Sequence, residues 1–235
     1  VVRPKIVVNV ARPKAQMVER FRQFFVPDIS DAVGQLYTMD SGIRPIYRPM
    51  GRLAGVAMTV KTPPGDTSTI QRALHMVRAG DVLVVDARGY TECCGSGAGS
   101  LVPAIERGLA GVVIDGAWRD VSELRVLGFP LFSRGISAFS APKCRPGEIN
   151  VPVCCGGVIV HPGDIVVCDE EGCVVVPRDE AHAVADSLNE YESKSGLSDW
   201  DVGEIDRRKK ETNKRFFEEV FEARGGVILD RRDPS

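Results

Sequence analysis

Two apolar runs near the middle of the chain restrict its fold more than any other feature. Asp81–Asp86 (DVLVVD) and Gly111–Asp115 (GVVID) are short and rich in β-branched residues, so both predict buried strands. The glycine-rich stretch Gly95–Ser100 lies between them and opens a predicted helix that runs to about Arg107. Strands that alternate with helices in this way are typical of α/β proteins.

Helices and strands continue to alternate through the first half of the chain. Amphipathic spacing and capping residues indicate the helices, and short apolar runs indicate the strands. The predicted strands are Leu53–Lys61 and Leu131–Ser133, and the predicted helices are Lys14–Phe25 ending before Pro27, a short helix from Ser30 through Leu36, a helix capped by Asp66 or Thr67 and closed by Gly80, Val121–Leu127, and Asp179 to about Lys194.

The second half of the chain changes character. From Glu148 to Pro177 the pattern is β throughout, with turn signals at Gly156-Gly157, Pro162–Asp164 and Glu171-Gly172. Alternating elements followed by a β meander predict an α/β fold with a mixed sheet and not a regular doubly wound fold.

The last stretch of the chain is charged and has helical spacing. Its apolar stripe consists of Ile205, Phe216, Phe217, Val220 and Phe221. Because such a helix has little core of its own to join, we expect it to pack on a neighbouring subunit. The sequence therefore predicts one domain over 1–198 and a C-terminal helical arm over 199–235.

Composition excludes several classes of protein. A formal net charge of -2 gives no broad attraction to nucleic acid or anionic lipid. No apolar run approaches the roughly 20 residues that span a bilayer, and the first residues lack the apolar core of a signal peptide, so we expect a cytoplasmic protein. The seven cysteines are odd in number and form no CxxC motif, which favours reduced thiols over disulfides. The three histidines are far apart in sequence, and their spacing does not call for a zinc site.

The glycine-rich stretch is the first candidate for a binding site. The backbone amides around Gly97, Ala98, Gly99 and Ser100 open a helix, where unpaired donors and the helix dipole favour a carboxylate or carbonyl oxygen. The stretch lacks the GxGxxG spacing of dinucleotide sites, and the chain has no GxxxxGK[ST] phosphate loop. Small-anion binding and a purely structural turn both remain open.

Arg119-Asp120 follows the second apolar strand and has two interpretations. In the first, Asp120 and Glu123 form a capping box at the start of a helix, and Arg119 is a surface ion-pair residue. In the second, Asp120 is a hard oxygen ligand for a divalent cation and Arg119 is a fixed cationic clamp for a 2-oxo acid. Both can hold together, because a capping carboxylate keeps a second oxygen free.

Several stretches resemble the regulator-of-ribonuclease-activity A family, whose enzymatic branch includes the 4-hydroxy-4-methyl-2-oxoglutarate and 4-carboxy-4-hydroxy-2-oxoadipate aldolases. The resemblance covers about residues 30–190, and its most specific part is the VxDGxxRDxxE run that ends at Glu123. The matching stretches are Gly80–Asp86, Gly108–Asp120, Leu127–Phe132, Gly156–Asp169 and Gly172–Pro177.

The resemblance implies a three-layer β/β/α sandwich that assembles into homotrimers or homohexamers with active sites between subunits. It implies Mg²⁺ or Mn²⁺ held by Asp120 as the metal ligand, and Arg119 as the catalytic residue that binds the small 2-oxo acid substrate. The non-catalytic branch, which binds ribonuclease E, does not keep the Arg-Asp pair, whereas this chain does.

One position departs from the family's aldolases. Many of them have an acidic residue on the N-terminal side of the Arg, with twenty residues between the two. In this chain the Arg is Arg119, and Ala98 occupies the acidic position. Glu92 is one substitute for it, and Glu190, Glu192 and Glu204 are candidates for the acidic residue that a neighbouring subunit contributes.

These features together predict a class II aldolase that cleaves a 4-hydroxy-2-oxo acid to pyruvate and a second carbonyl compound. Decarboxylation of oxaloacetate passes through the same enolate and is expected at the same site. Lys61 and Lys143 have no convincing Schiff-base context. A non-enzymatic, protein-binding regulator is the alternative, and a methyltransferase is excluded because no suitably spaced glycine-rich nucleoside loop follows the first strand.

Overall fold

The computed structural model describes residues 3–195, 207, 210–215 and 222–224, with side chains described up to Glu190 in the first range. The chain divides into two units, Val1–Glu190 and Tyr191–Ser235, and the sheet and the candidate site lie in the first. Of the predicted arm, helical turns at 207 and 210–215 and the 3-10 helix Glu222–Arg224 are described. The arm's apolar stripe lies outside the described residues, so its packing stays a prediction.

A mixed sheet forms the framework of the first unit, with the order β1-β5-β4-β3-β2-β9-β10 and β6 paired beside β2. β2, β3, β4 and β5 are parallel, while β9, β10, β1 and β6 join the sheet antiparallel. The strands are β1 (Arg44–Pro45), β2 (Leu53–Lys61), β3 (Asp81–Cys94), β4 (Gly111–Trp118), β5 (Leu131–Ile136), β6 (Glu148–Ile149), β9 (Ile165–Asp169) and β10 (Gly172–Val176).

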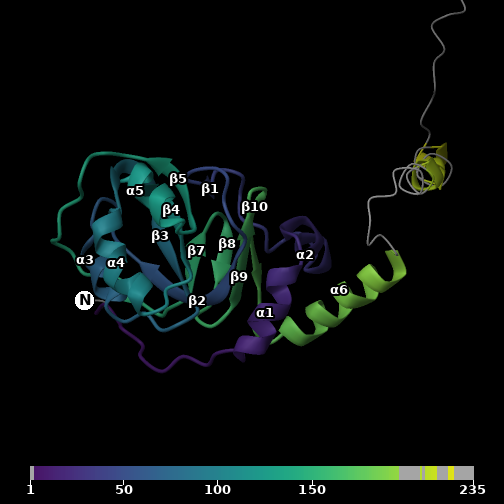
Figure 1. Cartoon of the computed structure of the whole chain (residues 1–235), viewed down its shortest axis with the longest axis horizontal. Coiled ribbons are helices and arrows are strands. Elements are labelled where there is room, and N and C mark those ends of the chain that lie inside the picture. The colour runs from purple at the N-terminus through teal and green to yellow at the C-terminus, as the bar shows by residue number, and fades with distance from the viewer. Residues whose placement is uncertain (1–2, 196–206, 208–209, 216–221, 225–235) are drawn as a thin grey trace, which may run out of the picture. The chain divides into compact units, whose positions relative to one another are not determined.

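The predicted α/β class with a mixed sheet is confirmed. β4 is buried at all of its positions, as expected for a strand covered on both faces. Three helices gather beside β3 and β4, and they are α3 (Ser68–Leu74), α4 (Ala98–Glu106) and α5 (Val121–Leu127) (Figure 1). The finer expectation of a three-layer sandwich stays a prediction.

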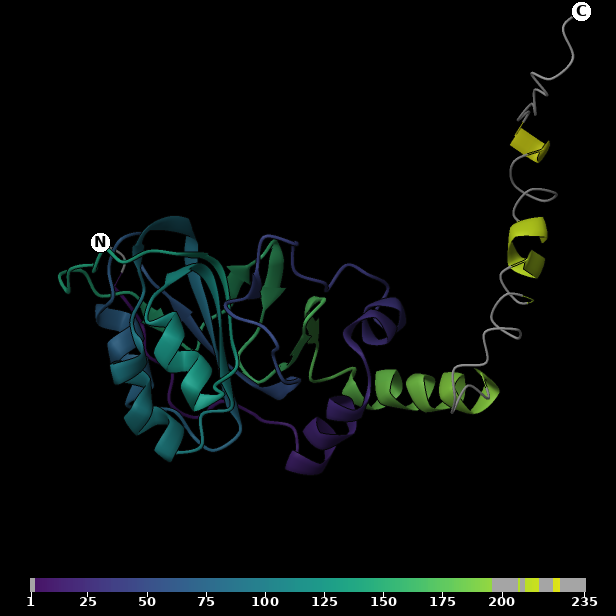
Figure 2. The same cartoon turned by 45° about the horizontal axis from the view of Figure 1, so that its top comes forward.

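A second group of helices packs near the other edge of the sheet, beside β9 and β10. These are α1 (Ala15–Gln23), α2 (Val26–Ala32) and the first part of α6 (Ala181–Ser195) (Figure 2). Phe21 and Ile29 are fully buried against apolar residues of the outer strands. The carboxylate of Asp169 at the end of β9 accepts a hydrogen bond from the Val26 N–H (3.0 Å) and thereby fixes the start of α2.

One continuous segment connects the two edges of the sheet. Its first part pairs with β10, where the Met39 N–H donates to the Cys173 carbonyl (2.9 Å) and the Val175 N–H donates to the Tyr37 carbonyl (2.9 Å). Its last part is β1, which pairs with β5 at the other edge. The sheet is therefore nearly closed.

A short hairpin, β7 (Val153–Cys155) and β8 (Val158–Val160), is held to the sheet by carboxylates within β3 and β4. Asp115 accepts a hydrogen bond from the Gly156 N–H (3.0 Å) and from Arg134 Nε (2.5 Å). Arg134 also donates two hydrogen bonds to Asp40, which hold the pKa of that carboxyl below its ordinary value. Asp86 of β3 accepts hydrogen bonds from the Arg88 N–H (2.9 Å) and the Cys154 N–H (3.4 Å), so both aspartates that end the predicted apolar runs have structural partners.

Several predicted boundaries were wrong. The second helix begins at Val26 and not after Ser30, because Pro27 is accepted in a first turn, where its missing N–H costs nothing. α3 ends at Leu74, and Gly80 adopts a left-handed conformation (φ 80°) before β3 and does not cap a helix. β3 and β4 run past their predicted ends to Cys94 and Trp118, with register shifts between them that sequence periodicity does not reveal.

Candidate active site

The candidate site lies where β4 ends and α5 begins. Asp120 occupies the N-cap position of α5 with a left-handed backbone (φ 61°, ψ 44°), and its side chain makes no capping hydrogen bond to α5. The predicted capping box with Glu123 is therefore wrong. A left-handed conformation is unusual for a residue other than glycine, although Asp tolerates it better than most.

The Asp120 carboxylate instead reaches the glycine-rich loop. Its Oδ2 accepts a hydrogen bond from the backbone N–H of Ala98 (2.9 Å), the first residue of α4. Gly97 makes this approach possible, since a Cβ there would lie 2.1 Å from the same oxygen. The carboxylate thus caps α4 from a distant loop and keeps Oδ1 facing away from that hydrogen bond.

Arg119 has an unsatisfied donor. Its Nε is buried and has no hydrogen-bond partner in the described part of the chain, and it lies 3.7 Å from Asp120 Oδ1, too far for a hydrogen bond. The side chains of Arg119 and Asp120 are 39% and 34% exposed. Buried donors are normally paired, so this one is suited to an acceptor that arrives with a ligand.

The glycine-rich loop is held by α3 and β4. The hydroxyl of Thr67 donates to the Gly95 carbonyl, and the Gly95 N–H donates to the Ala117 carbonyl (2.8 Å). Gln71 Nε2 donates to the hydroxyls of Ser96 (2.7 Å) and Ser100 (3.3 Å). The four residues predicted to bind substrate therefore form the N-cap and first turn of α4, next to Arg119 and Asp120. Thr67 and Gln71 had not been expected in this role.

A second set of hydrogen bonds fixes the start of α3. Asp66 is 3% exposed, and its carboxylate accepts hydrogen bonds from the Ser68 N–H and hydroxyl and from the N–H groups of Cys144 and Arg145. Of the two predicted capping residues, Thr67 occupies the N-cap position of α3, while Asp66 accepts the hydrogen bond from the first N–H of the helix. Burial by itself raises the pKa of Asp66, but these hydrogen bonds outweigh it and leave the pKa below the ordinary 3.8.

The geometry leaves Asp120 as the candidate metal ligand. No group of three or more His, Cys, Asp or Glu side chains placed to hold a metal ion occurs in the described ranges. Glu92 and Glu190 are exposed, Glu204 lies outside the described residues, and the Glu192 side chain is likewise not described. A single hard carboxylate with one oxygen free fits Mg²⁺ or Mn²⁺, because such ions keep several waters and need few protein ligands.

Other nucleophiles do not compete for the chemistry. All seven cysteines are free. Burial raises the pKa of the Cys155 and Cys173 thiols well above the ordinary value, which disfavours reactive thiolates. Lys61 and Lys143 are exposed, and Lys61 Nζ lies 3.9 Å from Glu148 Oε2. The described part of the chain has no helix long and apolar enough to cross a membrane.

Comparisons with known proteins agree with the resemblance. Residues 26–175 match the RraA-like family model, described as Aldolase/RraA. A Halalkalibacterium halodurans protein provisionally named 4-hydroxy-4-methyl-2-oxoglutarate aldolase is 35% identical over 177 residues, 74% of this chain and 83% of the relative. A Thermus thermophilus protein named 4-hydroxy-4-methyl-2-oxoglutarate aldolase is 32% identical over 154 residues, 64% of this chain and 91% of the relative.

Two solved structures share the fold. RraAS2 of Streptomyces coelicolor, described as an unusual member of the RNase ES inhibitor RraA family, has a TM-score of 0.72 and 31% identity over 81% of this chain and 98% of its own. A Thermus structure described as the RNA-processing inhibitor RraA has a TM-score of 0.60 and 30% identity, covering 66% of this chain and 93% of its own.

Proposed function

Because this chain belongs to the RraA-like family, we propose that it is a divalent-metal-dependent class II aldolase. Its substrate is a 4-hydroxy-2-oxo acid, and its products are pyruvate and a second carbonyl compound. The observation that carries the proposal is the Arg119-Asp120 pair at the end of β4, with one buried donor and one carboxylate oxygen left for a ligand.

The residues of the site have separate tasks in this reaction. Arg119 binds the oxo-acid end of the substrate through its planar guanidinium and remains charged throughout. The N-terminal turn of α4 adds its dipole to the binding of the substrate's carboxylate. Asp120 would hold Mg²⁺ or Mn²⁺, and the cation, when bound, supplies electrophilic stabilisation of the enolate.

The bond changes define what Arg119 must stabilise. A general base accepts the 4-hydroxyl proton, the O–H electrons form the new carbonyl at C4, and the C3–C4 bond breaks so that its electron pair forms the pyruvate enolate. Protonation at C3 then gives pyruvate. Since negative charge develops on the enolate oxygen, a preorganised guanidinium beside it lowers the barrier. Oxaloacetate decarboxylation needs the same enolate, so we propose it as a second activity.

The exposure of the site supports an assembly with shared sites. The side chains of Arg119 and Asp120 are each just over one-third exposed (39% and 34%). Catalytic groups act best away from bulk water. We therefore propose that a second copy of the chain completes the site in a homotrimer or homohexamer. Cytoplasmic localisation stays part of the proposal.

Pyruvate release tests the function directly. The full-length protein is treated with chelator, dialysed and assayed over a panel of 4-hydroxy-2-oxo acids and oxaloacetate, with and without Mg²⁺ or Mn²⁺. We expect pyruvate release from at least one acid only when a cation is restored. Undiminished activity after exhaustive chelation would exclude the class II mechanism.

A non-enzymatic regulator is the second candidate, favoured by Ala98 at the position where many of the family's aldolases have an acidic residue. Absence of pyruvate release from every acid of the panel, with either cation present, would favour a protein-binding role. In that case Arg119→Lys should not alter any measured property except binding to a protein partner.

A further inference from the structure

A cavity of about 210 Å³ lies at the opposite end of the parallel strands from Arg119 and Asp120. Its lining includes Asp81, the first residue of β3, and Val56, which pairs with Asp81 in the neighbouring strand. Arg119, by contrast, follows the last residue of β4. The cavity is therefore separate from the proposed catalytic site.

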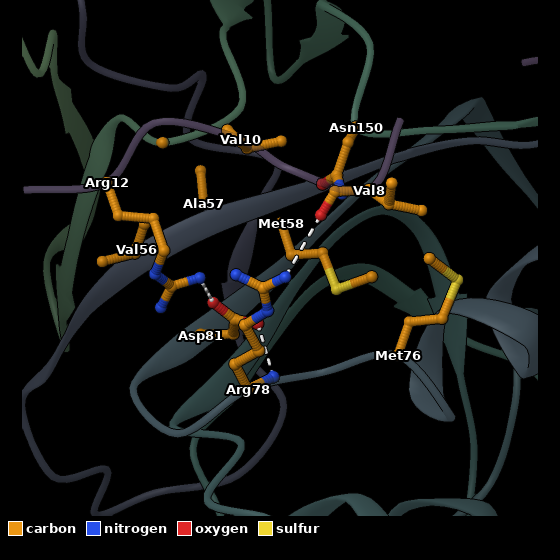
Figure 3. Close-up of a pocket in the computed structure, with 11 residues that line it drawn as sticks. Val8, Val10, Arg12, Val56, Ala57, Met58, Met76, Arg78, Asp81 and Asn150 are labelled. Atoms are coloured by element: carbon orange, nitrogen blue, oxygen red, sulfur yellow. Dashed lines mark hydrogen bonds and ion pairs between the residues drawn. The ribbon is translucent and has the colours of Figure 1, made fainter. Parts of the chain in front are cut away.

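The N-terminal segment passes over this cavity and is fixed there (Figure 3). The Val7 N–H donates to the Ile149 carbonyl (3.1 Å), and Asn150 Nδ2 donates to the Val7 carbonyl (2.8 Å). Arg78 NH2 donates to the Val8 carbonyl (3.2 Å). Backbone and side-chain hydrogen bonds thus hold the segment in place and define the shape of the cavity.

Most of the lining is apolar. Figure 3 shows the side chains of Met58 and Met76 beside the cavity, both flexible groups that adapt to a ligand's shape. The apolar lining residues are Val8, Val10, Val56, Ala57, Met58 and Met76. For scale, an apolar cavity of about 150 Å³ takes up benzene. The space accordingly suits a compact body of about five or six heavy atoms.

The lining of the cavity contains two arginines, Arg12 and Arg78, and one carboxylate, Asp81. Asp81 is 2% exposed and accepts hydrogen bonds from the Arg12 guanidinium and from the Arg78 N–H (2.7 Å). Arg12 therefore has its carboxylate partner. The Arg78 guanidinium donates to the uncharged backbone carbonyl of Val8. Among the described residues, this guanidinium has no carboxylate partner.

We propose that this cavity binds a small monocarboxylate with a compact apolar body, and that Arg78 anchors its carboxylate. The guanidinium of Arg78 presents a planar fork that matches a carboxylate, and it is exposed enough for a ligand to reach it. One surplus charge matches one carboxylate, while the valine and methionine lining matches the apolar remainder. The site is independent of the proposed aldolase reaction.

Methionine-methyl NMR tests the proposal on the full-length protein, because Met58 and Met76 line the cavity whereas Met39 and Met50 do not. The protein, labelled at its methionine methyl groups, is titrated with 3-methylbutanoate. We expect saturable shifts of Met58 and Met76 with a dissociation constant on the order of millimolar, as small ligands give. The uncharged 3-methylbutan-1-ol should bind at least about tenfold more weakly.

Two variants complete the test. Arg78→Gln should weaken 3-methylbutanoate binding at least about tenfold, and Arg78→Lys should weaken it less, since it keeps the charge without the fork. Arg72→Gln removes an exposed arginine of α3 that does not line the cavity and should leave binding unchanged. Met17 lines a separate cavity beside α1. Unshifted Met58 and Met76, undiminished binding by Arg78→Gln, or shifts at Met17 in place of Met58 and Met76 would each overturn the proposal. None of these outcomes depends on pyruvate release.

Discussion

Arg119 and Asp120 are neighbours in sequence but differ in which of their hydrogen-bonding groups are already paired within the protein. One oxygen of the Asp120 carboxylate accepts a hydrogen bond from the Ala98 N–H. This bond positions the carboxylate and leaves its second oxygen for a ligand. Arg119 keeps a buried Nε with no partner among the described residues. One residue is therefore held in place by the fold, and the other retains a donor that a ligand can satisfy.

Paired variants test this difference. Arg119→Lys keeps the charge but loses the planar fork, and losing one preorganised donor to a developing oxyanion typically costs roughly 3–4 kcal/mol, about 10²–10³ in kcat. Asp120→Asn keeps an oxygen for the Ala98 N–H but removes the charge that would hold a cation, so metal-dependent activity should disappear. Steady-state pyruvate release measures both.

Folding provides the control for these variants. Half-exposed ion pairs contribute about 0–1 kcal/mol, so the free energy of unfolding of both should stay close to that of the parent. Asp179→Asn, at an 85% exposed carboxylate, should change neither property. If the parent is active and both site variants equal it, the active site lies elsewhere.

Gly97 and Gly99 form a matched pair for a second test. A Cβ on Gly97 would lie 2.1 Å from Asp120 Oδ2 and 3.1 Å from Arg119 Nε, whereas a Cβ on Gly99 would meet no atom within 4 Å. Gly97→Ala should therefore displace the Arg-Asp pair and reduce kcat at least about tenfold, a shift of roughly 1.4 kcal/mol in the barrier. Gly99→Ala should keep full activity, with equal or slightly higher stability because Ala favours a helix. Equal activity of the two variants would show that the contact has no role in catalysis.

At the scale of elements, the sequence predicted best where a single physical signal dominated. Leu53–Lys61 and Val121–Leu127 have the predicted bounds, because the first is a mostly apolar run and the second has clear helical spacing. The sequence also predicted that the glycine-rich loop and Arg119-Asp120 lie close together, because each follows one of two buried strands. The bond from Ala98 to Asp120 could not be predicted, since it joins residues 22 positions apart through the tertiary fold.

The missed features have a common cause. β3 continues through Arg88, Tyr90 and Glu92, which are exposed or half-exposed polar residues that resemble a loop in sequence. The braces at Asp66, Thr67 and Gln71 depend on partners brought together only by folding. Local sequence pattern reports burial along a strand or helix and contains little information on such contacts.

The Asp66 brace predicts a pH dependence of stability. Its folded pKa lies below 3.8, so its contribution is present above that pH and is lost as the pH falls through the folded pKa. Asp66→Asn should lower the free energy of unfolding by about 1.5–3 kcal/mol at neutral pH, because it removes a buried charged acceptor. The deficit relative to the parent should shrink below about pH 4. Urea unfolding of both proteins at a series of pH values measures this difference in the free energy of unfolding. A difference that is constant with pH would contradict a stabilising role for the charged Asp66 carboxylate.

For the whole molecule, the central prediction is assembly. We expect sedimentation as a trimer or hexamer, because the candidate site is open in one copy and the sequence predicts an apolar stripe on a charged C-terminal helix. Deletion of 199–235 should shift the protein towards smaller species or expose apolar surface that a hydrophobic dye detects. A stable monomer with full activity would refute the shared site.

The segment that joins the two edges of the sheet has a consequence for solubility. Unpaired strand edges are templates on which another chain can add a strand and begin aggregation. Here Tyr37–Met39 covers β10 and Arg44-Pro45 covers β5, so a single stretch of chain protects both flanks. Proline at one of these positions adds to the protection, because it cannot donate to an incoming strand. Insertions that displaced this segment would therefore expose the edges of β5 and β10 to strand addition by another chain.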